Sequence, residues 1–233
     1  LLEMGDPVAA EVELKKAKDL GFAEEKLAPL TAKALLRLGK FKALFETFGK
    51  ANYTDPQIQA EVLTAVGAAY SEQKQPQEAR QLFEAAAKLA PEDVTVNLAL
   101  ARQMALSKEY EGALARLNRL LEKTPDAPDV LKLRGDIFRA QGNVDAAKKD
   151  YQQAMAAKKI FSPAYAAMVA VALSENNVEA ARQAVESLKK VAPNELNTRF
   201  METRVLFKEH KFKEARERVA QLLKDMPDNP SVM

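Results

Sequence analysis

The chain has 233 residues, of which 47% are apolar, so it can bury a large core without that core being one globule. Its 35 Lys and Arg residues against 33 Asp and Glu residues give a net charge of +2, and we therefore expect no nucleic-acid partner. The absence of cysteine excludes disulfides, thiolate metal sites and cysteine nucleophiles. No stretch approaches the roughly 18 apolar residues of a membrane span, and no signal peptide opens the chain, so no transmembrane segment is expected.

The first predicted element is a single helix over Val8 to Leu20. Asp6-Pro7 is typical of a helix N-cap followed by proline at the first helical position, and Gly21 is typical of the residue that ends a helix. Residues 1–24 therefore make only half of a two-helix unit. Because the chain starts inside a unit and begins with Leu, we expect it to be a fragment of a longer protein.

Six complete two-helix units are predicted next, with a period of about 34 residues. We place them at 25–59, 60–93, 94–127, 128–161, 162–195 and 196–229, with a tail at 230–233. The period is clearest in one small residue of each second helix, at Ala79, Ala113, Ala147, Ala181 and Ala215. Apolar residues four and seven positions later complete one face of each second helix. Prolines mark most unit breaks, and where one is missing we expect Ser162-Pro163 to supply the N-cap and first turn.

This pattern resembles the tetratricopeptide repeat over essentially the whole chain. The unit at 60–93 matches it at Leu63, Gly67, Tyr70, Ala79, Phe83, Ala86 and Pro91, and the unit at 128–161 matches at Leu131, Gly135, Phe138, Ala147, Tyr151 and Ala154. The chain departs from the pattern by having no Trp and by Arg199 and Thr203 in the last unit. The resemblance implies an all-α fold in which residues 1–233 form a single right-handed superhelical α-solenoid.

The opening residues, 1–17, are similar to a narrower group. These are the tetratricopeptide lipoproteins of exopolysaccharide and PEP-CTERM sorting systems in Gram-negative bacteria. The similarity implies a periplasmic, outer-membrane-associated protein with a lipid anchor upstream of this fragment. A cytoplasmic location is the alternative.

Residues suited to catalysis are scarce. His210 is the only histidine, which argues against histidine metal sites, and we place it at the turn between the last two helices. The pairs Glu24-Glu25 and Glu92-Asp93 fall near predicted helix starts, where acidic side chains favour the helix dipole. No glycine-rich phosphate loop is present. We therefore expect a protein that is not an enzyme, with no catalytic residue, no cofactor and no metal.

The residues that do not serve the repeat pattern are the candidates for partner binding. In the resembled family, first helices line a concave groove through the second, fifth, ninth and twelfth positions of each unit. The partner-binding candidates at these positions are Arg102, Asp129, Lys132, Asp136, Arg139, Phe200, Arg204 and Phe207. Arginine there would offer charge-assisted hydrogen bonds to an extended peptide or a partner helix.

Structural alternatives exist for several of these candidates. The charged residues of the fourth unit, Lys132, Asp136 and Arg139, are spaced so that they can pair with one another across helical turns. Phe200 and Phe207 can pack between repeats instead of binding. Chaperone-binding relatives carry Lys and then Asn where this chain has Lys132 and Asp136, so a co-chaperone role is disfavoured.

We predict a noncatalytic scaffold for protein–protein interaction, a periplasmic lipoprotein segment that supports exopolysaccharide assembly or export. One alternative is the regulatory repeat region of a larger enzyme, such as a glycosyltransferase. Direct polysaccharide binding is a weaker third possibility, because only 6% of residues are aromatic. Exposed ends of the array would also permit self-association.

Overall fold

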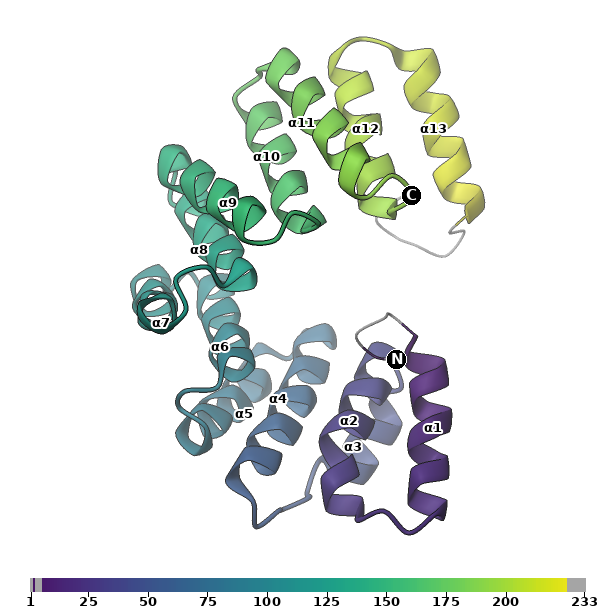
Figure 1. Ribbon diagram of the computed structural model, residues 1–233, viewed down its shortest axis with the longest axis vertical. Coiled ribbons are helices and arrows are strands. Elements are labelled where there is room, and N and C mark those ends of the chain that lie inside the picture. Colours follow the sequence, from purple (N-terminus) through teal and green to yellow (C-terminus); the bar gives the residue numbers. More distant parts are fainter. Residues whose placement is uncertain (1, 3–5, 226–233) are drawn as a thin grey trace. The chain divides into compact units, whose positions relative to one another are not determined.

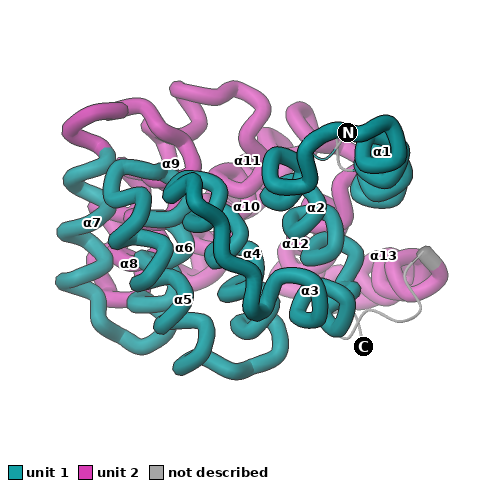
Figure 2. Tube along the Cα trace, turned by 90° about the horizontal axis from the view of Figure 1, so that it is seen from below, with its two compact units in different colours: residues 1–120 teal, residues 121–233 magenta. Residues whose placement is uncertain are grey.

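The computed structural model describes residue 2 and residues 6–225, and within them the fold is all-helical (Figure 1). The chain divides into two compact units, residues 1–120 and residues 121–233, which Figure 2 colours separately. The all-helical architecture confirms the predicted all-α class. The first unit contains α1 (Pro7–Asp19), α2 (Glu24–Arg37), α3 (Phe41–Phe48), α4 (Pro56–Glu72), α5 (Pro76–Leu89) and α6 (Val94–Leu106), and α7 (Tyr110–Lys123) crosses the division. The second unit contains α8 (Pro128–Ala140), α9 (Val144–Ala157), α10 (Ser162–Ser174), α11 (Val178–Val191), α12 (Leu196–Lys208) and α13 (Phe212–Asp225).

Local sequence signals explain where several helices begin and end. The Asp6 carboxylate accepts a hydrogen bond of 2.9 Å from the Ala9 amide and caps α1, as predicted. The helix begins at Pro7, one residue before the predicted Val8. Gly21 lies two residues after the end of α1 and adopts the left-handed conformation, with φ of +85°, which stops the helix there. His210 lies at the α12–α13 turn, as expected, and also has positive φ. Within the described residues, no helix is both long and apolar enough to cross a membrane.

The repeat boundaries show both agreement and difference. Helices α6, α8, α10 and α12 begin at residues 94, 128, 162 and 196, the first residues of four predicted repeats. Helix α4 instead begins at Pro56, four residues before the predicted start at 60, because Asp55 caps it and Pro56 suits a first helical turn. The extent of a single solenoid over 1–233 stays a prediction, and its tail at 230–233 lies outside the described residues.

One N-cap prediction is wrong. Ser162 is already the first residue of α10, and the preceding Phe161 occupies the cap position without a side-chain hydrogen bond. The Ser162 hydroxyl donates instead to Glu195 Oε2 at 2.5 Å. Phe161 is buried, so this helix start is fixed by packing and by a contact with the next repeat rather than by a cap.

Each repeat closes around a small residue on its second helix. Ala79, Ala113, Ala147 and Ala181 are fully buried, and Ala215 is 5% exposed. The facing pairs are matched in size along the chain. Gly67 faces Phe83 and Gly135 faces Tyr151, whereas the fully buried pair Ala101 and Leu117 holds the same positions in the repeat between them. A larger residue on one helix is thus accompanied by a smaller one on the other, as close packing requires.

Charged side chains connect consecutive repeats within each unit. In the second unit, Lys148 of α9 binds Glu175 at 2.6 Å, and Arg182 of α11 binds Glu209 at 2.6 Å. Both carboxylates lie at the turn between the helices of the following repeat, 27 residues further on. The sequence analysis considered charge pairs only within one helix, so these links between repeats are a finding of the structure.

A buried ion pair fastens α8 to α9. The Arg134 guanidinium donates from Nε and from a terminal nitrogen to the two oxygens of Asp150, both at 2.7 Å. The Asp150 side chain is only 4% exposed, whereas that of Arg134 is 22% exposed. This two-point geometry fixes both side chains, and it orients the helix that carries several of the candidate site residues.

Candidate functional site

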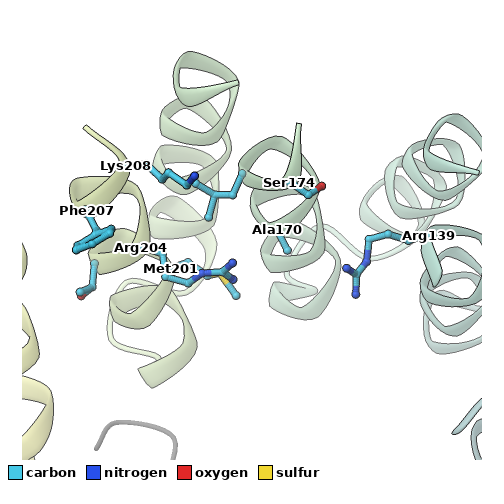
Figure 3. A pocket seen from close by; sticks show the side chains of 9 residues that line it. Arg139, Ala170, Ser174, Met201, Arg204, Phe207 and Lys208 are labelled. Atoms are coloured by element: carbon cyan, nitrogen blue, oxygen red, sulfur yellow. The ribbon is translucent and has the colours of Figure 1, made fainter. Parts of the chain in front are cut away.

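A pocket of about 650 Å³ opens on the first helices of three consecutive repeats in the second unit. Its walls come from α8, α10 and α12 (Figure 3). The lining residues are Arg139, Ala170, Leu173, Ser174, Met201, Thr203, Arg204, Phe207 and Lys208. Repeat stacking therefore brings together side chains that are up to 69 residues apart in the sequence.

The pocket combines an apolar floor with positive charge. Ala170 on α10 lies between Arg139 on α8 and Arg204 on α12 (Figure 3), and Leu173 on α10 also lines the pocket. Arg139, Arg204 and Lys208 are cationic, and none of the nine described lining residues is acidic. The pocket is therefore electropositive, although the chain as a whole is nearly neutral.

The two hydroxyl groups of the pocket already have hydrogen-bond acceptors. Ser174 donates to the Val171 carbonyl at 2.7 Å, and Thr203 donates to the Arg199 carbonyl at 2.9 Å. Their oxygens can still accept, but their protons are engaged within their own helices. Arginine and lysine are thus the donors that a bound molecule would meet.

Asp136 is held by two neighbours on the second unit. It accepts a hydrogen bond of 2.6 Å from Lys132 and one of 2.9 Å from the Tyr151 hydroxyl. Burial first, and then the Asp136 carboxylate, raise the pKa of the Tyr151 hydroxyl, and the nearby Arg139 opposes that rise. The structural alternative is thus confirmed for Lys132 and Asp136, which pair with each other, whereas Arg139 contacts the hydroxyl of Tyr151.

Other carboxylates on the neighbouring turns are also engaged. Glu175 binds Lys148, while Glu209 binds both Arg182 and Lys211, the latter at 2.9 Å. The hydrogen bonds from Lys211 and Arg182 hold the pKa of Glu209 below its ordinary value. These acids are oriented toward cations outside the pocket, so they do not neutralise its lining.

The eight predicted binding residues are distributed unevenly. Arg139, Arg204 and Phe207 all line the pocket, together with Ala170 and Leu173, which occupy predicted groove positions of the repeat at 162–195. Four other candidates, Asp129, Lys132, Asp136 and Phe200, belong to the same unit but not to the lining, and Arg102 is exposed on α6 of the first unit.

Sequence reasoning missed four lining residues. Ser174 and Lys208 are 34 residues apart and directly follow the predicted twelfth positions, Leu173 and Phe207. The repeat period was therefore a usable signal for this pair, because a helix end presents two adjacent residues to the groove. Met201 and Thr203 sit at positions that the repeat pattern assigns to packing. Thr203 was noted only as a departure from that pattern, and no sequence signal indicated Met201.

Two hollows of the first unit provide a contrast. One, of about 360 Å³, lies among α1, α2 and the unusually short α3, and its rim carries both acids and bases, including Glu11, Lys15 and Glu24. The other, of about 540 Å³, contains Arg119, which binds Glu92 at 2.7 Å. Neither has the one-sided charge of the pocket on α8, α10 and α12. Across the described residues, no group of three or more His, Asp or Glu side chains is placed to hold a metal ion.

Comparison with known proteins supports the repeat class. Two family models, both described as tetratricopeptide repeat, match residues 70–137 and 130–160. No curated protein matches the sequence. The chain is thus supported as a tetratricopeptide-repeat protein, a fold consistent with scaffolds for protein–protein interaction.

Several solved structures share the fold. PilW, described as a widely conserved type IV pilus biogenesis factor, is 14% identical with a TM-score of 0.72, and the match covers 91% of this chain and 98% of PilW. The pilF protein of Pseudomonas aeruginosa is 16% identical with a TM-score of 0.66, over 88% of this chain and 93% of that one. A thermophilic tetratricopeptide-repeat protein of Thermus thermophilus is 16% identical with a TM-score of 0.66, over 74% and 94% of the two chains. At these identities the likeness establishes the fold alone.

Proposed function

We propose that this chain is a noncatalytic scaffold that binds an extended segment of a partner protein in the pocket on α8, α10 and α12. The observation that carries the proposal is the composition of that pocket, where an apolar floor lies between arginines from different repeats. Apolar surface supplies affinity for a peptide, and arginines fix its position through charge-assisted hydrogen bonds. Arg139, Arg204 and Phe207 form the centre of the proposed site. The other predicted binding residues, Asp129, Lys132, Asp136 and Phe200 of the second unit and Arg102 of the first, stay proposals outside this lining.

The proposed cellular setting is the periplasm, where the chain would be a segment of a lipoprotein that supports exopolysaccharide assembly or export. Support comes from the similarity of residues 1–17 to lipoproteins of such systems. The fold likeness to PilW, described as a type IV pilus biogenesis factor, is compatible with a role in the cell envelope. Fractionation of the native protein tests the location, and recovery in the cytosolic fraction would contradict it.

The docking site is tested by charge reversal. Full-length protein and the double variant Arg139→Glu/Arg204→Glu would be used to capture partners from an envelope fraction, with quantitative mass spectrometry as the readout. A matched control, Lys149→Glu/Lys190→Glu, makes the same charge change at sites on second helices of the same unit, outside the pocket lining. We expect the captured proteins to be lost from the pocket variant and kept by the control. Equal capture by all three proteins would refute the proposed site.

A further inference from the structure

We infer that the pocket on α8, α10 and α12 takes an acidic peptide segment in which two carboxylates flank an apolar side chain. This inference rests on the proposed function, and it adds the chemistry of the partner. It follows from three features of the second unit: pocket cations that have no acidic partner among the described residues, their placement on helices on either side of α10, and the exposed ring at the pocket wall.

Among the residues that the structure describes, no acidic side chain of the second unit pairs with the cations of the pocket. Lys208 donates to the neutral Asn176 amide oxygen at 3.3 Å, and Arg204 lies 3.7 Å from the sulfur of Met201. Neither contact supplies a negative charge. Arg139 approaches the hydroxyl of Tyr151, which burial keeps protonated by raising its pKa. A carboxylate of the ligand would therefore meet cations whose described contacts are all to neutral groups.

The acids that lie within three residues of the lining in the sequence do not fill this role, because each is engaged elsewhere. Asp136 binds Lys132 and Tyr151, and Glu202 binds Lys189 at 3.3 Å. Glu209 is held by two cations outside the pocket. Within the described part of the second unit these acids are thus paired, whereas Arg139, Arg204 and Lys208 have no acidic partner. The complementary charge then comes from the ligand.

The arrangement of the cations sets a spacing for the ligand. Arg139 and Arg204 extend from helices on either side of α10 (Figure 3). Packed helices lie about 8 to 10 Å apart, so the axes of α8 and α12 are separated by about twice that distance. Because both arginine side chains extend into the pocket, the distance between their charges is shorter, on the order of 10 to 15 Å. An extended chain advances about 3.3 Å per residue, which corresponds to acidic residues about three to five positions apart.

The apolar part of the ligand has a place between these charges. Phe207 is 61% exposed, yet its ring is held edge-on against Phe212 at a centroid distance of 5.3 Å. Together with Met201 and Leu173 it forms an apolar wall and floor. A large apolar side chain of the ligand would cover this surface and gain both buried area and an aromatic contact.

Selection from a random peptide library tests the inference without assuming a sequence. Random dodecapeptides, held between neutral Gly-Ser flanks so that no free terminus is offered, would be displayed on phage and selected on the full chain. The same selection would use Arg139→Glu/Arg204→Glu and the control Lys149→Glu/Lys190→Glu. Circular dichroism checks that each protein is folded, and Arg139→Gln/Arg204→Gln provides a milder second variant.

The expected result is enrichment of peptides with Asp or Glu about three to five residues apart around an aromatic or large aliphatic residue. Such peptides should bind the Glu and Gln variants at least tenfold more weakly and the control equally well. Enrichment of neutral or basic peptides that still depend on Arg139 and Arg204 would overturn the acidic ligand but leave the docking site standing. Peptides that bind the pocket variants with the same affinity as the original chain would overturn both the acidic ligand and the docking site. The absence of any enriched peptide would do the same.

Discussion

Replacing Gly135 by alanine tests whether the size-matched pairs hold the repeats together. An added Cβ would lie 2.6 Å from Cε1 of Tyr151 and 3.2 Å from the Ala147 carbonyl oxygen. The ring cannot simply move away, because Tyr151 is fully buried and its hydroxyl donates to Asp136. We therefore expect Gly135→Ala to destabilise the second unit.

The expected magnitude combines two opposing effects. Overpacking in a dense core costs about 1 to 3 kcal/mol, and the severity of this overlap places the cost near the upper end. Alanine in a helix gains roughly 1 kcal/mol over glycine. The net loss is then about 1 to 2 kcal/mol, which lowers the folded-to-unfolded ratio by about one order of magnitude.

A double-mutant cycle with Tyr151→Leu isolates the contact. Tyr151→Leu alone should cost about 2 to 3 kcal/mol through the lost ring and hydrogen bond. Combined with Gly135→Ala it reproduces the pair Ala101 and Leu117, which is fully buried in another repeat. The double variant should therefore be more stable than the sum of the single losses by about 2 kcal/mol.

The assay is chemical denaturation followed by circular dichroism, together with native-state hydrogen exchange of the α8 and α9 amides. Hydrogen exchange is needed because repeat proteins can unfold in parts, so one global transition does not locate the loss. Additive effects, within about 0.5 kcal/mol, would refute the reasoning, since they would mean that the ring and the new methyl group do not meet.

Three further predictions concern the same unit. Asp150→Asn should lower the free energy of unfolding by about 3 kcal/mol, because it removes the negative charge that the partly buried Arg134 binds at two points. The control Asp145→Asn changes an exposed side chain and should leave the free energy of unfolding nearly unchanged. Glu209→Gln should lower the free energy of unfolding by about 1 to 2 kcal/mol at neutral pH. The pKa of Glu209 in the folded chain lies below its ordinary 4.5, so the carboxylate becomes protonated as the pH falls below 4.5 and through the folded-state pKa. Over that range the difference in unfolding free energy between the variant and the original chain should vanish. Ala147→Leu should cost about 1 to 3 kcal/mol by overpacking, and unchanged thermal unfolding would show that this residue does not face its partner helix.

The fold was predictable because its signals are local and repeated. A small residue every 34 positions, with apolar residues four and seven positions later, marks the buried face of each second helix, and the burial of Ala147, Tyr151 and Ala154 agrees with it. The same small residue occurs in five successive repeats, so each occurrence supports the assignment of the others. Ser162 shows the limit of this reasoning: its hydroxyl was assigned to a cap because the local sequence permits one, but it bonds Glu195, 33 residues away.

The site was less predictable for a physical reason. The repeat register identifies which side chains face the groove, and so it identified Arg139, Arg204 and Phe207. It does not reveal which charges are already neutralised. Lys132 and Arg139 look equivalent in the sequence, but Lys132 is paired with Asp136, whereas Arg139 reaches the pocket. The spacing of Lys132 and Asp136 permits their pairing within α8, but the sequence does not show that Tyr151 of α9 also binds Asp136 or that Arg139 lines the pocket.

Methionine methyl resonances offer the most direct test of the docking site. Met201 lines the pocket, whereas Met104 lies on α6 of the first unit and Met155 lies on α9, outside the lining. With methyl-labelled methionine, the full chain would be titrated with the acidic peptide that the library selection enriches most. We predict a saturable shift of the Met201 resonance that disappears in Arg139→Glu/Arg204→Glu. Binding that shifts Met104 or Met155 and leaves Met201 unchanged would contradict the pocket on α8, α10 and α12 as the docking site.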